Sequence, residues 1–316
     1  SIDSYFNATA GKYGLVELST RYGDCLMPEI ITVDVKELKR KKIMKDTLFS
    51  PLLVEQVREA LSRGEQAILF QNRRGFAPMI ECRGCGWVPH CVNCDVSLTY
   101  HKAHNQLVCH YCGYTYRLPQ VCPECKGTEF KMQGFGTEKV EEEIAGQFPA
   151  VKVERLDFDT ARTRTAYERI ISDFEKGKTQ ILIGTQMLSK GLDFGNVSVV
   201  GILSADSLMN FPDFRAHERA YQLMVQVSGR AGRRDKRGTV ILQTTQPEHP
   251  LIRMVQHFAY KEMVSLQLSE RSMFRYPPYY RLIVLILRSR NEEALQEMSA
   301  LYAEKLRARL GERVLG

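Results

Sequence analysis

Eight of the nine cysteines form four Cys-x-x-Cys pairs between residues 82 and 125, and Cys25 lies outside this cluster. A Cys-x-x-Cys pair on a tight turn points two thiolates at one position, and two such turns complete a tetrahedral zinc site. Disulfides would suit a small secreted protein, whereas this segment lies inside a long chain whose sequence has no signal-peptide pattern. We therefore predict two Zn²⁺ ions, with these ligands: Cys82, Cys85, Cys91, Cys94, Cys109, Cys112, Cys122 and Cys125.

The four pairs can combine in two ways that differ in loop length. In a nested arrangement, the inner pairs form one site across residues 95–108, and the outer pairs form the other. In a sequential arrangement, only residues 86–90 would separate the first two pairs, which is tight for a cage of four thiolates. We expect nested pairing, and a structural role for both sites, because four cysteine ligands leave no open coordination position. The expected sets are Cys82, Cys85, Cys122 and Cys125, and Cys91, Cys94, Cys109 and Cys112.

A second stretch suited to chemistry is QVSGRAGRR at residues 226–234. It places Arg230 and Arg233 three positions apart, so that on a helix both guanidinium groups would share one face. Such groups bind phosphate or carboxylate through two hydrogen bonds. Gly229 and Gly232 each cost a helix about 1 kcal/mol relative to alanine, which favours close approach of another backbone or a ligand. The alternative is a solvated basic helix end.

Composition restricts the class of protein. The chain has 316 residues, of which 44% are hydrophobic and 26% charged, as is typical of a soluble globular protein with room for two domains. It contains no apolar run long enough for a membrane span, so we expect no membrane partner. The formal charge is +7, which two four-cysteine zinc sites would lower to about +3. Charge alone therefore does not indicate nucleic-acid binding.

Strands and helices alternate on both sides of the cysteine segment. Apolar runs predict strands at residues 66–70, 151–157, 180–185, 197–206 and 238–244. Helices are expected at residues 163–177 and from Thr137, which we predict as an N-cap. The pattern predicts an α/β fold with a parallel sheet covered on both faces. Functional residues are then expected in loops at the carboxyl ends of the strands, such as GTQMLSKGLDF.

The predicted domains follow from this pattern. Residues 1–60 are expected to be the tail of a preceding lobe and a linker, and residues 61–81 with 126–250 form the α/β lobe. Residues 82–125 are the zinc-binding insertion, and residues 251–316 begin a further α/β domain with a strand after the double proline and a helix from Asn291. Gly177, Lys178 and Thr179 do not form a P-loop, because the required earlier glycine is absent and a helix precedes them.

Several motifs together resemble a known family. GTQMLSKGLDF and QVSGRAGR are similar to motifs V and VI of superfamily 2 helicases. Together with the four cysteine pairs, LFQNRRGFAP, GFGTE and SADSLMNFPDFRAHERAYQ, they resemble the PriA family of primosomal helicases, which restart stalled replication forks. The resemblance implies the second RecA-like lobe of an ATP-dependent 3′–5′ DNA helicase. The first lobe with its Walker motifs would lie outside the chain, so the fragment alone is expected to be inactive.

The resemblance also implies roles for individual residues. Arg230 and Arg233 would be arginine fingers for ATP and Mg²⁺ held by the first lobe, with Gln226 on the same cleft face. Gly191 and Asp193 would approach the nucleotide, unless they only shape a turn. Arg73 and Arg74 would bind DNA, unless they lie in a solvated loop. The remaining DNA contacts would be Thr185, Lys190, Gly136 and Thr137.

The same resemblance implies a bacterial protein in the cytoplasm, associated with the nucleoid and expected to be a monomer, and it implies partners for the whole protein. These are forked and single-stranded DNA, single-strand-DNA-binding protein and other primosome proteins. The alternative is a zinc-ribbon module that binds nucleic acid or protein without any motor role. Within the cysteine segment we expect the aromatic residues to form a small core rather than stacking platforms. They include Trp87, Tyr100, Tyr111, Tyr114 and Tyr116.

Overall fold

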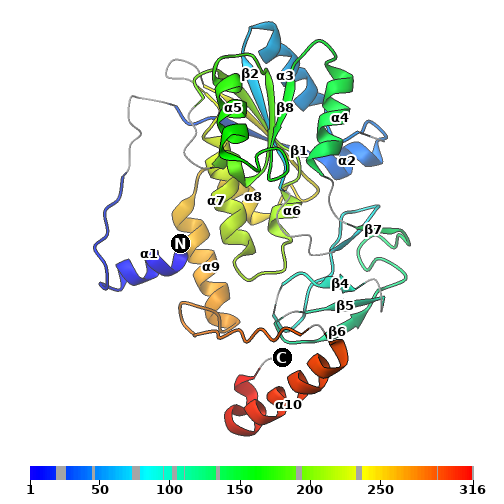
Figure 1. Ribbon diagram of the computed structural model, residues 1–316, viewed down its shortest axis with the longest axis vertical. Helices are drawn as coiled ribbons and strands as arrows, with labels where there is room; N and C mark the ends of the chain where they lie inside the picture. The colour runs from blue at the N-terminus through cyan, green and yellow to red at the C-terminus, as the bar shows by residue number, and fades with distance from the viewer. Residues whose placement is uncertain are drawn as a thin grey trace.

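Six parallel strands form the central sheet. The computed structural model describes residues 1–18, 26–44, 47–72, 79–94, 96–101, 105–109, 111–132, 136–189, 194–232, 237–289 and 291–314. The strand order is β1-β11-β10-β2-β9-β8, and every neighbouring pair runs parallel (Figure 1). The strands are β1 (Glu29–Asp34), β2 (Gln66–Phe70), β8 (Val153–Leu156), β9 (Ile181–Gly184), β10 (Val197–Ile202) and β11 (Thr239–Thr244). The parallel α/β fold predicted from the apolar runs is confirmed.

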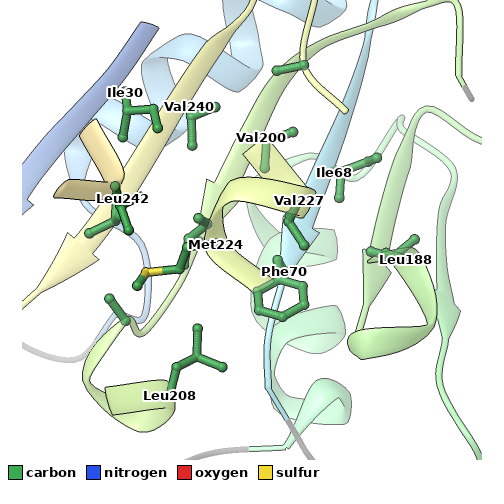
Figure 2. Packing of buried hydrophobic residues seen from close by; sticks show 14 of the residues in the cluster. Ile30, Ile68, Phe70, Leu188, Val200, Leu208, Met224, Val227, Val240 and Leu242 are labelled. Carbon is green, nitrogen blue, oxygen red and sulfur yellow. The ribbon is translucent and has the colours of Figure 1, made fainter. Parts of the chain in front are cut away.

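Helices cover both faces of this sheet, because successive strand residues point to opposite sides. Ile68 and Phe70 contribute to one hydrophobic cluster, and Ala67 and Leu69 to the other. In the first cluster, side chains of α7 lie against the strands (Figure 2). This face carries α5 (Arg164–Glu175), α7 (Ala216–Ser228), α8 (Pro250–Gln256) and α9 (Tyr260–Met273), and the other carries α3 (Pro51–Ser62) and α4 (Thr137–Gln147).

Two helix starts follow the local sequence, and the start of α4 differs from its prediction. The Ser50 hydroxyl accepts a hydrogen bond from the Leu53 N–H at the start of α3, and Thr163 does the same for Ala166 in α5. At α4 the N-cap is Gly136, without a side-chain cap, so the prediction of Thr137 as the N-cap is wrong by one residue. The reason is that the Thr137 hydroxyl donates to Asp157 instead.

The first 60 residues differ from the expected tail and linker. Strand β1 pairs with β11 along its whole length, from Glu29 opposite Thr239 to Asp34 opposite Thr244. After α2 (Val35–Arg40), helix α3 packs into the core. The sequence EIITVD is short and half polar, so its pattern does not separate a strand from a linker. It becomes a strand because β11 offers an unpaired edge.

The last 66 residues also differ in part from the expectation. Leu251, Ile252 and Val255 of α8 and Met263 and Val264 of α9 lie in the first hydrophobic cluster, so both helices belong to the lobe. The strand expected after the double proline is absent, because no strand among the described residues pairs with residues 281–289. The expected helix is present as α10 (Glu292–Leu310), capped by the Asn291 side chain. None of the described helices is long and apolar enough to cross a membrane.

The cysteine-rich insertion forms its own small unit beside the lobe (Figure 1). Its stem is the antiparallel pair β3 (Ile80–Cys82) and β7 (Phe130–Met132), and the rest is a three-stranded sheet. The strands of that sheet are β4 (Thr99–His101), β5 (Gln106–Val108) and β6 (Thr115–Arg117). The stem therefore extends the insertion beyond the cysteines, and we call residues 80–132 the zinc module.

Candidate functional site

The eight cysteines of the zinc module form two groups of four. In each group all four sulfur atoms lie within 4.8 Å of one another. Cys82 Sγ and Cys125 Sγ are 3.5 Å apart, and Cys91 Sγ and Cys112 Sγ are 3.6 Å apart. A tetrahedral zinc site with Zn–S bonds of about 2.3 Å places its sulfurs about 3.8 Å apart, whereas a disulfide bond is about 2.05 Å long. The predicted nested sets are confirmed: Cys82, Cys85, Cys122 and Cys125, and Cys91, Cys94, Cys109 and Cys112.

Tight turns aim the paired thiols at one point. The Gly86 N–H donates to the Cys82 carbonyl oxygen at 2.8 Å, and the Gly113 N–H donates to the Cys109 carbonyl oxygen at 2.9 Å. Gly86 and Gly113 have φ values of +75° and +69°, which glycine adopts without steric cost. Lys126 takes the same conformation after Cys125, with a φ of +62°, so the turn requires a positive φ, and glycine supplies it in two of the four pairs.

Burial and hydrogen bonds set the protonation of several thiols in these groups. Burial raises the pKa of Cys85 to about 12 and that of Cys109 to about 11. Hydrogen bonds from the Gly127 N–H and from neighbouring thiols lower the pKa of the exposed Cys125 to about 7. Buried thiols therefore keep their protons at neutral pH unless a metal ion replaces them. Zn²⁺ fits four sulfur ligands, and it would crosslink the chain rather than catalyse a reaction.

Aromatic side chains pack around the two cysteine groups. Tyr100, Tyr111 and Tyr116 lie against the inner group, and Trp87 lies against the outer group beside Phe130. Tyr114 is 49% exposed, although its ring contacts Tyr116. Most of these residues thus form the small core that we predicted, and Tyr114 is the exception.

The zinc module also packs against the lobe, at contacts that sequence patterns do not reveal. A Cβ on Gly86 would lie 2.7 Å from the Thr245 Oγ1. The Thr245 hydroxyl donates to the buried Asp206 carboxylate at 2.7 Å. The turn that contains Cys82 and Gly86 therefore packs directly against the loop that follows β11.

Arg230 lies in a turn and not on a helix face. Helix α7 ends at Ser228, and Gly232 has a φ of +105°, which does not continue a helix. The idea that Arg230 and Arg233 share a helix face is therefore wrong for Arg230, and Arg233 lies outside the described residues. The Gly232 N–H donates to the Val197 carbonyl oxygen at 3.0 Å, so the turn is fixed to the start of β10.

Close backbone packing requires a glycine at position 238, opposite this turn. A Cβ on Gly238 would lie 2.3 Å from the Gly232 nitrogen, so the two chain segments touch. Arg230 is half-buried, and Gln226, on the last turn of α7, is exposed. The short helix η2 (Gln186–Ser189), which follows β9, contacts α7. The structure therefore brings the first part of GTQMLSKGLDF against the helix that leads to Arg230.

A second group of predicted residues gathers at the carboxyl edge of the sheet. Thr185 follows β9 directly and is buried, and its N–H donates to the Leu156 carbonyl oxygen at 3.4 Å. The next residue of that chain, Asp157, accepts a hydrogen bond from the Thr137 hydroxyl at 2.6 Å. Gly136, at the start of α4, is exposed. Arg230 instead lies near the amino end of β10, so the predicted site residues do not all gather at the carboxyl edge of the sheet.

Several predicted residues lie outside the described part of the chain. They are Arg73, Arg74, Lys190, Gly191, Asp193 and Arg233, together with Cys25. Asp157 is a residue that the sequence reading missed. Its signal was available, since RLDFDT places an aspartate directly after a strand at the edge where Thr137 begins a helix.

Two family profiles match this architecture. The profile described as the PriA DNA helicase Cys-rich region (CRR) domain matches residues 91–117, which include the inner cysteine group. The profile of the helicase conserved C-terminal domain matches residues 128–235, from the stem of the zinc module to the turn after α7. The parallel sheet flanked by helices is thus a RecA-like helicase lobe.

Curated proteins are similar along nearly the whole chain. Replication restart protein PriA of Bacillus subtilis (strain 168) is 43% identical over 306 residues, which cover 97% of this chain and 37% of that protein. The protein of the same name from Treponema pallidum (strain Nichols) is 35% identical over 318 residues, covering 100% of this chain and 47% of that protein. The chain therefore spans less than half the length of these relatives.

Among solved structures, S. cerevisiae Dbp5 bound to RNA and ADP BeF3 has 12% identity and a TM-score of 0.39, with 84% of this chain and 52% of that chain covered. That likeness is too low to support a shared function. The matched profiles, the two cysteine groups and the identity to the bacterial proteins agree with one another. The chain belongs to the PriA family of replication restart proteins.

Proposed function

We propose that this chain is the second motor lobe of an ATP-dependent 3′–5′ DNA helicase that restarts stalled replication forks and loads the primosome. The observation that carries the proposal is the Arg230 turn, which ends α7, is tied to β10 through Gly232, and follows a helix that η2 contacts. A zinc-binding module alone would not need this turn. The position supports a cation presented from a rigid scaffold to a partner lobe.

In this proposal ATP and Mg²⁺ are bound by the first lobe, because no P-loop occurs in the sequence of this chain. Arg230 and Arg233 stabilise the charge that develops as the γ-phosphoryl bond breaks, and Gln226 lines the same face. Gly191 and Asp193 contact the nucleotide. The chain alone then shows no DNA-stimulated ATPase, and robust turnover by the purified chain would overturn the proposal.

DNA contact is proposed at the carboxyl edge of the sheet, through the phosphate backbone and without base specificity. The backbone N–H groups at Gly136 and Thr137 are suited to a phosphate, since they begin a helix without a side-chain cap. Thr185, Lys190, Arg73 and Arg74 complete the proposed surface. Forked and single-stranded DNA are the proposed substrates, and single-strand-DNA-binding protein and other primosome proteins are the proposed partners of a cytoplasmic monomer.

The deciding experiment is Arg230→Ala in the full-length protein, with ATPase and DNA binding measured side by side. An arginine finger predicts a loss of about 10³-fold or more in ATP turnover with unchanged DNA affinity. The matched control is Arg219→Ala, on the exposed side of the same helix, where only an ion pair with Asp213 is lost. Loss of DNA binding with ATPase retained would favour the alternative, a zinc-ribbon binding module without a motor role.

A further inference from the structure

A buried carboxylate lies at the carboxyl edge of the sheet, where the predicted DNA contacts gather. Asp157 follows β8 directly and is 0% exposed. Its Oδ1 accepts hydrogen bonds from the N–H groups of Asp159 and Thr160, at 2.9 and 3.0 Å. Its Oδ2 accepts the Thr137 hydroxyl at 2.6 Å and lies 3.5 Å from an Arg155 nitrogen. The carboxylate thus joins the loop after β8 to the first turn of α4.

Asp157 carries its negative charge at neutral pH. Burial by itself would raise the pKa of the carboxyl group. The Thr137 hydroxyl, the Thr160 N–H and Arg155 outweigh this effect and lower the pKa below its ordinary value. A charged acceptor makes a stronger hydrogen bond than a neutral one, so the Thr137 hydroxyl is firmly held.

The held hydroxyl determines how α4 begins. Thr137 is buried, and its oxygen faces Asp157 rather than the N–H groups at the start of its own helix. The N-cap Gly136 has no side chain to occupy those groups either. In the neighbouring strand Gly184 is opposite Leu156, so Thr185 and Asp157 are the next pair in register. Asp157, which holds the start of α4, and Thr185 therefore lie next to each other at the ends of two neighbouring parallel strands.

We propose that Asp157 is a positioning residue for nucleic-acid binding, which holds Thr137 so that the first turn of α4 stays at a fixed distance from Thr185. It touches no ligand itself. This inference rests on the proposed function, because it assumes that the carboxyl edge binds a phosphate backbone. Asp157 is negatively charged, whereas a site that binds phosphate groups is expected to carry positive charge.

That charge makes the inference sharply testable. If Asp157 were only a bystander, Asp157→Asn would remove a negative charge near the phosphates and tighten DNA binding. If Asp157 positions α4, the same change weakens binding, because the Thr137 hydroxyl then bonds to a neutral amide instead of a charged carboxylate, and that hydrogen bond is weaker. The two explanations predict opposite signs.

The test uses the full-length protein and a fluorescent single-stranded oligonucleotide of mixed sequence, titrated without nucleotide. Thr137→Val is expected to weaken binding about tenfold, as for loss of a hydrogen bond to a charged group, and Asp157→Asn is expected to weaken it less, because a neutral hydrogen bond remains. The double variant is expected to be no weaker than Thr137→Val alone, because both changes act on the same contact. Thr137→Ser, which keeps the hydroxyl, is expected to retain wild-type affinity.

A matched control lies at the other end of the same strand. Glu154 of β8 accepts the Thr179 hydroxyl at 2.7 Å and pairs with Arg169 at 2.9 Å. Glu154→Gln and Thr179→Val are expected to leave DNA affinity unchanged. In DNA-stimulated ATPase assays, the Asp157 and Thr137 variants are expected to need more DNA for half-maximal rate but to keep the DNA-saturated rate.

Three results would overturn the inference. They are equal or tighter binding by Asp157→Asn, additive effects of the two changes, and equal losses in the Glu154 and Thr179 controls. If Asp157→Asn does not fold, the comparison of Thr137→Val with Thr137→Ser decides alone. Failure of the proposed function is a separate outcome, in which the wild-type protein itself does not bind the oligonucleotide.

Discussion

The Tyr276 hydroxyl donates a hydrogen bond to the backbone carbonyl oxygen of Cys94, with the two oxygens 3.1 Å apart. Tyr276 follows α9, and Cys94 belongs to the inner cysteine group of the zinc module. The Tyr276 ring also stacks on Phe214, with centroids 4.5 Å apart and an interplanar angle of 10°. Phe214 in turn donates its N–H to the Tyr111 hydroxyl. The zinc module is thereby tied to both the end of α9 and the loop that leads into α7.

Tyr276→Phe tests the strength of this tie. The substitution keeps the stacked ring and removes only the hydrogen bond to Cys94, so we expect a loss of about 1 kcal/mol in the free energy of unfolding. Urea unfolding of the zinc-loaded protein measures it. Tyr280→Phe is the control, because that side chain is half exposed, and its effect is expected to be close to zero. An equal effect of both substitutions would contradict the contact.

Breaking a buried ion pair beside Phe214 is expected to destabilise the fold more than losing the hydrogen bond of Tyr276 does. Arg271 and Glu218 side chains are 1% and 4% exposed, and their charged groups are 2.7 Å apart. Glu218 also accepts the Ile2 N–H at 2.9 Å, so it joins α1 (Ile2–Thr9), α7 and α9. Arg271→Met leaves the carboxylate buried without its partner, and we expect a loss of about 3–5 kcal/mol in the free energy of unfolding.

A matched double variant distinguishes the contribution of the ion pair from that of side-chain packing. Arg271→Met together with Glu218→Leu removes both charges, so most of the stability lost in Arg271→Met is expected to return. Urea unfolding of the wild type, both single variants and the double variant gives the coupling energy. A double variant as unstable as the sum of the single variants would mean that the two charges are not coupled.

Metal removal is expected to affect the zinc module selectively. Its apolar clusters are small and consist partly of the cysteines themselves, whereas the sheet has large clusters on both faces. After chelation we expect fast amide hydrogen exchange in residues 80–132 and retained protection in β2, β9 and β10. The metal content of the untreated chain is expected to be two Zn²⁺, measured by mass spectrometry. Loss of protection throughout the sheet would contradict a separable module.

The sequence predicts most of the sheet because buried parallel strands are short, apolar and interrupted by polar loops. Strands β2, β9, β10 and β11 have that pattern, and the spacing of the cysteines fixes the nested zinc sites. Strand β1 is half polar, and only its pairing with β11 makes it a strand. The apolar run at residues 281–289 shows the opposite case, since it has strand composition and no described partner.

The parts of the candidate site that depend on one local motif can be predicted from the sequence. The parts where distant segments of the chain meet cannot. The Cys-x-x-Cys turns need only a few neighbouring residues, so their geometry follows from sequence. Asp157 meets Thr137 from 20 positions away, and Tyr276 meets Cys94 from 182 positions away. Such pairs depend on how strands and helices pack, which spacing along the chain does not encode. The turn at Arg230 does not follow from the spacing of its arginines, because Gly232 has a positive φ and ends the helical geometry.

A histidine between the zinc module and the lobe makes stability depend on pH. His217 lines a cavity with His90, Asp213 and Arg271, and its ring centroid is 5.3 Å from that of His249. Burial, assisted by His249 and His90, lowers the pKa of His217 to about 4. The unfolded chain binds this proton near pH 6.5, so the stabilising contribution is complete above about pH 6.5 and is lost as pH falls towards 4.

His217→Gln removes that titration and is therefore expected to flatten the pH dependence of unfolding. Between pH 6 and pH 5 the wild type is expected to lose about 1 kcal/mol more than the variant, which corresponds to nearly one proton. Urea unfolding at pH 7.5, 6 and 5 measures the difference, in which acid effects on the zinc thiolates cancel because both proteins share them. His257→Gln, at an exposed position, is the control and is expected to follow the wild-type curve. Parallel curves for His217→Gln and wild type would show that His217 titrates alike in the folded and unfolded chains.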